Sequence, residues 1–242
     1  LLGGSLLMMV AFWRGFRPAQ LAGQWRHLHV IALLGVALCN GAQVWAMQWV
    51  PSHASALLNA SSAMWIVLFG LWGWRAHRPP LHALAGLAIG FAGTVLLVWP
   101  AGDETAAATA AATPLLPQLA ILAGCVVWSM STVYMRNHSL QLDLFALVGM
   151  PMLIGGTWLV LAGVLSGELG QWHWNGGGLL ALGYLVVMSS CFAYTAYAWL
   201  ARHATPAQTG TYGYVNPAIA AVAGYLVLGE TLTPLQAMVA AV

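Results

Sequence analysis

The arginines of this chain occupy alternate gaps between its long apolar segments. All seven basic side chains are arginines: Arg14, Arg17, Arg26, Arg75, Arg78, Arg136 and Arg202. The intervening gaps hold Asp103 with Glu104, then Glu168, then Glu230, and Asp143 is the one acid on the basic side. Short loops rich in arginine are retained on the cytoplasmic side of a membrane, so this alternation predicts a chain that crosses a membrane repeatedly. A soluble fold does not predict it.

The composition also favours a chain surrounded by lipid. With 61% hydrophobic and 5% charged residues, the chain lacks the charged surface of a soluble protein of this length. Its tryptophans gather near the ends of apolar runs, as at Trp45 and Trp49, where their rings suit the headgroup layer. A net charge of +2 does not indicate a nucleic-acid partner. Three single cysteines without metal-ligand spacing predict packing roles, and we expect neither a metal nor a cofactor: Cys39, Cys125 and Cys191.

The sequence contains nine apolar runs that are candidates for membrane helices. About 20 residues are needed to cross a hydrocarbon core of about 30 Å. The runs cover residues 1–13, 28–49, 53–74, 81–99, 115–135, 143–165, 178–200, 206–228 and 233–242. The first and last are too short to cross. We therefore expect a chain that is clipped at both ends, with one further helix ahead of residue 1.

An alanine- and threonine-rich tract at residues 101–113 predicts an extracytoplasmic linker between two halves. Residues 1–100 would be a first repeat without its first helix, and 114–242 a second repeat with a clipped last helix. Aligning residue n with n + 152 sets Trp45-Ala46 on Tyr197-Ala198 and the helix from Asn59 on that from Thr211. A five-helix repeat crosses an odd number of times, so the second copy is inverted. We expect an all-α membrane protein of ten helices in two inverted five-helix repeats, an arrangement typical of secondary transporters.

A limited set of polar and aromatic side chains lies inside the runs, where burial is costly without a partner or a water-filled cavity. Ser55, Asn59 and Ser62 follow a spacing of i, i+4, i+7, which places them on one helix face. One interpretation is a substrate cavity, in which amides and hydroxyls bind a zwitterionic group and rings stack on an apolar side chain. The alternative is hydrogen bonding between helices. The candidate cavity residues are Asn40, Gln43, Asn59, Ser62, Trp65, Trp128, Tyr194, Tyr197, Tyr212 and Asn216.

Two prolines inside runs are candidate hinges, or else static bends. Pro217 removes a backbone donor within residues 206–228, and Pro151 interrupts residues 143–165. No Asp, Glu, Lys or Arg falls in the interior of a run, which favours facilitated movement of a substrate over tight proton coupling. Paired carboxylates and the HExxH and GxSxG motifs are also absent from the sequence, so we do not expect an enzyme.

The stretch Thr211–Pro217, followed by Leu228–Leu232 and a further helix, resembles a known family. Its pattern of YxNP, an apolar helix and GExL is similar to the end of the second repeat of EamA-type members of the drug/metabolite transporter superfamily. This resemblance implies ten helices, cytoplasmic termini and a central cavity between the halves. Within the family, the chain is similar to YddG-like aromatic amino-acid exporters of bacterial inner membranes. The function implied is export of aromatic or apolar amino acids by alternating access. A multidrug or toxic-compound extruder, a channel and a membrane sensor are the alternatives.

Overall fold

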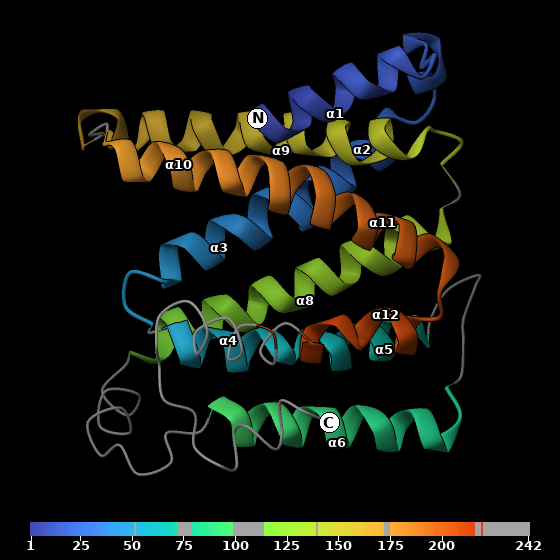
Figure 1. The fold of residues 1–242 in the computed structure, drawn as a ribbon, viewed down its shortest axis with the longest axis vertical. Helices are drawn as coiled ribbons and strands as arrows, with labels where there is room; N and C mark the ends of the chain where they lie inside the picture. Colours follow the sequence, from blue (N-terminus) through green and yellow to red (C-terminus); the bar gives the residue numbers. More distant parts are fainter. Residues whose placement is uncertain are drawn as a thin grey trace. The chain divides into compact units, whose positions relative to one another are not determined.

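All regular structure in the described part of the chain is helical. The computed structural model describes residues 1–50, 52–71, 79–98, 114–138, 140–171, 175–215 and 219 (Figure 1). The helices long and apolar enough to cross a membrane are Trp25–Ala46, Leu115–Asn137, Leu144–Leu165 and Gly176–His203. These findings agree with an all-α membrane protein. The count of ten helices stays a prediction, and the predicted linker and last run lie outside the described residues.

The helical elements follow the predicted runs with three main differences. The run predicted at 28–49 begins earlier, at Trp25, the run at 53–74 is interrupted at Ser61, and the run at 206–228 is interrupted at Thr211. Within the first and last of the four long helices, the segments η2 and η4 are π-helical, whereas η1 and η3 are short 3-10 helices. In chain order the elements are α1 (Leu2–Trp13), η1 (Pro18–Leu21), α2 (Trp25–Ile31), η2 (Ala32–Leu38), α3 (Cys39–Ala46), α4 (Ser52–Ala60), α5 (Ser62–Gly70), α6 (Leu81–Val98), α8 (Leu115–Asn137), α9 (Leu144–Leu165), η3 (Glu168–Gln171), α10 (Gly176–Tyr184), η4 (Leu185–Ala193), α11 (Tyr194–His203) and α12 (Pro206–Gly210).

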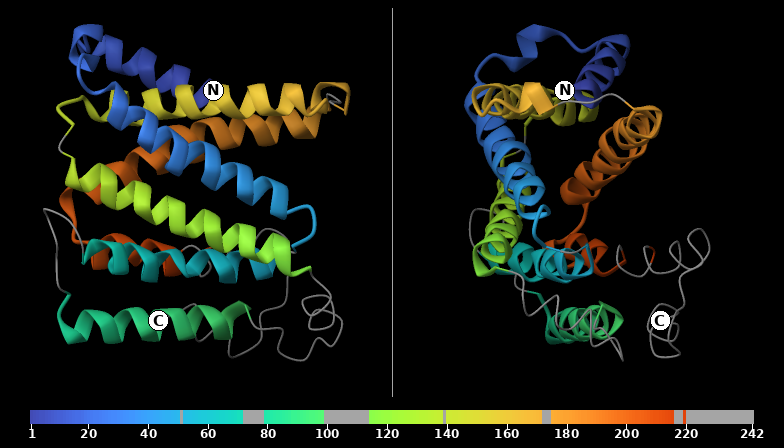
Figure 2. Two further views of the ribbon diagram at one scale, coloured as in Figure 1. Left: turned by 180° about the vertical axis from the view of Figure 1, so that it is seen from behind. Right: turned by 90° about the vertical axis from the view of Figure 1, so that its left-hand side faces the viewer.

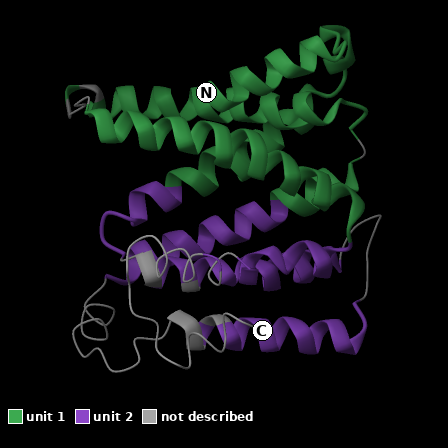
Figure 3. Cartoon of the chain, viewed as in Figure 1, with its two compact units in different colours: residues 1–41, 131–204 green, residues 42–130, 205–242 purple. Residues whose placement is uncertain are grey.

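The helices pack into two compact units (Figure 3). Unit 1 comprises residues 1–41 and 131–204, and unit 2 comprises residues 42–130 and 205–242. Each unit therefore combines segments from both sides of the predicted linker. The predicted repeats concern duplication of the sequence, which the division into packing units does not test. The two-repeat organisation therefore stays a prediction.

In unit 1, helix α1 lies along α9, as the views in Figures 1 and 2 both show. Glycines bring the two backbones close together. A Cβ on Gly149 would lie 3.1 Å from the carbonyl oxygen of Gly4, and a Cβ on Gly4 would lie 3.0 Å from that of Gly149. Such small faces are the usual means by which membrane helices approach closely. Leu7, Met8 and Leu147 continue the contact as part of the buried core of this unit.

Basic residues from distant parts of the sequence meet at one end of unit 1. The Arg14 Nε lies 3.4 Å from Oδ1 of Asp143, whose other carboxylate oxygen accepts from the first turn of α9. Arg202 Nη2 donates to the carbonyl oxygen of Leu140 at 2.7 Å. Glu168 follows the opposite end of α9, a helix of 22 residues and therefore about 33 Å long. This distribution agrees with the alternation of basic and acidic gaps in the sequence.

Unit 2 contains α4, α5, α6, α12 and the first part of α8. Helix α12 packs along α5, where Ala63, Val67 and Ala207 are buried together with Leu87 of α6. The ring of Tyr214 covers α6 so closely that a Cβ on Gly90 would lie 2.6 Å from its Cδ2. These contacts hold together segments that are more than 100 residues apart in the sequence.

A leucine at position 149 is expected to separate α1 from α9. Gly149→Leu should lower the free energy of unfolding by about 1–3 kcal/mol, since the new side chain meets backbone atoms that cannot move aside. Thermal or denaturant unfolding of the purified protein in detergent measures this change. Gly86→Leu is the matched control, because no described atom lies within 4 Å of a Cβ at that position. Equal stability of the two variants would contradict the glycine contact.

Candidate functional site

Two helices of unit 2 are interrupted by the same local chemistry. The Ser61 hydroxyl between α4 and α5 donates to the carbonyl oxygen of Leu58 at 2.6 Å. The Thr211 hydroxyl after α12 donates to the carbonyl oxygen of Gln208 at 2.7 Å. A hydroxyl that bonds back to the preceding turn competes with the helical ladder and bends the helix. Both helices are therefore interrupted at a hydroxyl residue.

The two interrupted helices lie side by side (Figure 2). A Cβ on Gly210 would lie 3.1 Å from the carbonyl oxygen of Ala63, and one on Gly213 would lie 3.6 Å from the Ser62 hydroxyl oxygen. Secondary transporters often build their substrate sites from discontinuous helices, whose free backbone groups face the substrate. We therefore regard this crossing, next to Ser62, as the candidate site in unit 2.

The amide of Asn59 takes part in several hydrogen bonds within unit 2. Its Nδ2 donates to Gln43 Oε1 at 3.1 Å and to the Ser55 hydroxyl at 3.3 Å, while Gln43 Nε2 donates back to Asn59 Oδ1. The Cys125 Sγ lies 3.4 Å from Oδ1 and 3.6 Å from the carbonyl oxygen of Leu58, and its one proton serves one of these acceptors at a time. Both donor hydrogens of the Asn59 amide and at least one lone pair of its oxygen are therefore used within the protein. Asn59 thus links α3, α4 and α8, as the hypothesis of hydrogen bonding between helices requires.

Helix α8 contributes a buried serine that the sequence analysis did not select. The Ser129 hydroxyl lies 3.1 Å from the carbonyl oxygen of Ser62 and 2.7 Å from that of Cys125, and its one proton serves one of these acceptors at a time. It therefore contacts the first residue after the Ser61 break. The sequence carries a signal for it, because Cys125, Ser129 and Thr132 follow the spacing i, i+4, i+7 on one helix face.

A second polar and aromatic group lies in unit 1. The hydroxyls of Tyr197 and Thr132 are 2.7 Å apart, and the ring centroids of Tyr194 and Tyr197 are 6.4 Å apart. The close approach of η2 depends on Gly35, where a Cβ would lie 2.6 Å from the Ser131 hydroxyl oxygen and 3.5 Å from that of Tyr194. Each of these tyrosines thus presents a large ring next to small hydroxyl residues.

The remaining candidates are distributed differently. Asn40 donates to the carbonyl oxygen of Val36 at 2.8 Å, within its own helix. Trp65 packs against the buried cluster that contains Cys125. Helix α9 continues through the buried Pro151, so its role as a hinge stays a prediction. Trp128 and Tyr212 are half-buried, whereas Asn216 and Pro217 lie outside the described residues.

The EamA-like transporter family model matches residues 1–99 and 115–242. The chain belongs to this family. The matched ranges leave out the segment that contains the predicted linker. As an EamA protein of the drug/metabolite transporter superfamily, the molecule is a multi-pass membrane transporter.

The relatives of this EamA protein carry transporter names. It is 30% identical to "Uncharacterized inner membrane transporter YedA" of Escherichia coli strain K12, over 98% of this chain and 74% of that protein. It is 28% identical to an "Uncharacterized transporter" of Archaeoglobus fulgidus, over 95% of this chain and 77% of that protein. "Threonine/homoserine exporter RhtA" of E. coli K12 is 36% identical over 92 residues, which are 38% of this chain and 30% of that protein. A solved crystal structure superposes with a TM-score of 0.78 over 99% of this chain and 80% of that one, at 20% identity, and so shows the shared fold.

A double-mutant cycle on Gln43 and Asn59 tests the amide pair. Gln43→Leu and Asn59→Leu should each destabilise the protein in detergent, and the double variant should lose less than the sum of the two. The expected coupling is about 0.6 kcal/mol and at most about 1.7 kcal/mol, the range for side-chain hydrogen bonds between membrane helices. Strictly additive losses would show that the two amides do not stabilise one another.

Proposed function

We propose that this EamA protein exports aromatic and other apolar amino acids across the bacterial inner membrane by alternating access. The observation that supports this most strongly is the crossing of two interrupted helices in unit 2, beside Ser62. In the proposal, a central cavity lies between two inverted repeats, and the substrate is held by backbone groups near the breaks and by aromatic rings. The proposed lining residues are Ser62, Trp65, Trp128, Tyr194, Tyr197, Tyr212 and Asn216.

The chemistry of the candidate residues favours a zwitterion with an apolar side chain. Hydroxyl and carbonyl groups next to Ser62 match an ammonium and a carboxylate group, while the rings of Tyr194 and Tyr197 match an apolar side chain. The partial similarity to a relative named as a threonine and homoserine exporter supports amino acids as the substrate class. The described membrane helices carry no acid in their interiors, which gives less support to extrusion of cationic drugs.

In this proposal, Gln43 and Asn59 support the fold and do not contact the substrate. Because both donor hydrogens of Asn59 are already used by Gln43 and Ser55, the pair positions α3 and α4 rather than binding substrate. Asn40 likewise supports its own helix at Val36. The substrate contacts are therefore assigned to the aromatic residues and to the backbone near the breaks.

The proposed topology places the arginine side and both termini in the cytoplasm. In a variant without native cysteines, Glu168→Cys should react with a membrane-impermeant maleimide added to intact cells. Arg26→Cys should react only after the membrane is permeabilised, because arginine-rich loops stay on the cytoplasmic side. Both positions are exposed, so a difference in labelling reports sidedness rather than burial. Labelling of both cysteines in intact cells would contradict the topology.

Trp128→Ala tests the aromatic contact with substrate. The variant should slow efflux of phenylalanine and tryptophan from loaded membrane vesicles by about three- to tenfold, since one aromatic contact is worth about 0.5–1.5 kcal/mol. The matched control is Trp13→Ala, which removes an indole that is 94% exposed and should leave the rate unchanged. Equal rates for the two variants, at equal amounts of protein in the membrane, would remove Trp128 from the substrate site.

A further inference from the structure

Two membrane helices of unit 1 contain π-helical segments at corresponding positions. Segment η2 interrupts the helix Trp25–Ala46, and segment η4 interrupts the helix Gly176–His203. The offset of 152 residues between the predicted repeats carries residues 33–38 onto 185–190, inside η4. A π-helix is rare; it occurs mostly as single turns inside α-helices, frequently at functional sites. Two such segments at matching positions are difficult to explain as unrelated irregularities.

The same offset also matches the helices against which these segments pack. It pairs Leu1-Leu2-Gly3-Gly4, at the start of α1, with Leu153-Ile154-Gly155-Gly156 in α9. This match is closer than that of Trp45-Ala46 with Tyr197-Ala198. It supports the two-repeat organisation independently of the charge pattern.

Each π-helical segment packs on the first glycine of the pair from the other half of the chain. A Cβ on Gly155 would lie 2.7 Å from Cβ of Val36 and 2.8 Å from the carbonyl oxygen of Ala32, both in η2. A Cβ on Gly3 would lie 2.5 Å from Cβ of Ser190 in η4. Without side chains at the two glycines, the π-helical segments rest directly on the backbones of α9 and α1. In each contact, a π-helical segment from one half of the chain packs on a glycine from the other half.

A π-helical turn is a weak point in a helix. Its hydrogen bonds run from i to i+5, so each turn holds one residue more than an α-helical turn, and a helix bends readily there. A predicted cavity residue lies just after each segment. Asn40 is the second residue after η2 and donates to the carbonyl oxygen of Val36, while Tyr194 is the first residue after η4. Bending at η4 would therefore move Tyr194 and Tyr197 together.

We propose that η2 and η4 are a matched pair of hinges, about which the two helices bend as the transporter alternates between its inward- and outward-open states. This inference rests on the proposed function, because it assigns the motion that alternating access needs. Gly3 and Gly155 keep the hinges close to α1 and α9 while leaving no side chain to obstruct the bend.

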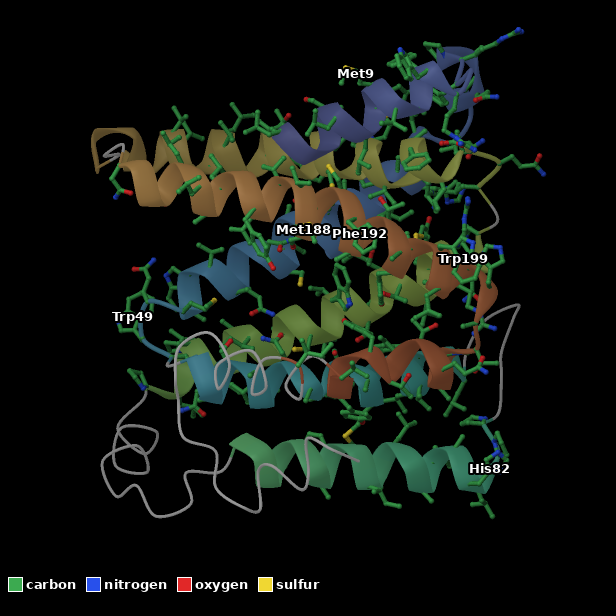
Figure 4. All side chains as sticks on the ribbon, in the orientation of Figure 1. Met9, Trp49, His82, Met188, Phe192 and Trp199 are labelled. Atoms are coloured by element: carbon green, nitrogen blue, oxygen red, sulfur yellow. The ribbon has the colours of Figure 1, made fainter. Side chains whose placement is uncertain are left out.

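Deleting one residue from a π-helical segment tests the hinge. Removal of Leu33 or of Val187 restores an α-helical turn and keeps the following residues on their original face. Leu33 is 41% exposed and Val187 is 54% exposed, and Figure 4 shows the neighbouring Met188 and Phe192 on η4. Each deletion should lower the maximal rate of phenylalanine efflux about tenfold, while phenylalanine still binds to the purified variant. Leu33→Ala and Val187→Ala are the matched controls and should transport at the wild-type rate. Deletion variants that transport at that rate would overturn the proposal.

Distances measured in the intact chain test the hinge even if a deletion variant does not fold. In a variant with its three native cysteines replaced by alanine, spin labels at Leu180 and Trp199 span η4, and a pair at Leu116 and Met130 spans an uninterrupted part of α8. All four positions are exposed. The pair across η4 should show two distance populations, whose ratio changes when phenylalanine is added, whereas the pair on α8 should show one.

The outcomes separate the two proposals. One narrow distance across η4, with and without phenylalanine, would overturn the hinge even if wild-type vesicles export phenylalanine. Two distances across η4 in a protein that does not export phenylalanine would support the hinge and reject the proposed substrate.

Discussion

The hydrocarbon core of a membrane offers no water to hydrogen-bond with the backbone, and this constraint accounts for several irregularities of the described helices. A carbonyl group released from a helix must find another donor within the protein. Ser61 and Thr211 supply hydroxyl donors at the two breaks in unit 2, and Asn40 supplies an amide at the end of η2. At one end of unit 1, Arg202 donates to the carbonyl oxygens of Leu140 and Leu142, in the segment between α8 and α9. Several polar residues of the described apolar runs are thus partners for the backbone.

This constraint also separates polar residues that complete the fold from those that can bind a substrate. Asn59 uses both donor hydrogens for Gln43 and Ser55, and its oxygen accepts from Gln43. A substrate that displaced one of these contacts would lose about as much as it gained. The rings of Tyr194 and Tyr197 would contact a substrate by stacking instead of by hydrogen bonds, and stacking leaves the Tyr197–Thr132 hydroxyl contact intact. Aromatic rings are therefore better suited than amides to a site that must bind and release its ligand repeatedly.

The sequence alone predicts a membrane protein and most of its helix positions, because the long apolar runs and the positions of the arginines can be read from it directly. Arg14 and Arg202, predicted on one side of the membrane, do lie at one end of unit 1. The break at Ser61 could not be predicted, since a serine inside an apolar run is equally consistent with an intact helix. The partnership of Cys125 with Asn59 depends on how α8 packs against α4, which one sequence does not reveal. The family followed from the motif Thr211–Pro217, whereas a closer likeness to aromatic amino-acid exporters remains part of the proposal.

The pairs Gly3-Gly4 and Gly155-Gly156 have two requirements to meet at once. The second glycine of the first pair meets Gly149 and allows α1 and α9 to touch, while the first glycine of each pair receives a π-helical segment. A larger residue at Gly155 would meet the backbone oxygen of Ala32, which cannot rotate away as a side chain can. The same short stretch of each helix therefore sets the close contact between α1 and α9 and brings η4 and η2 directly against the helix backbones. Any side chain added at Gly3 or Gly155 would have to displace one of these contacts.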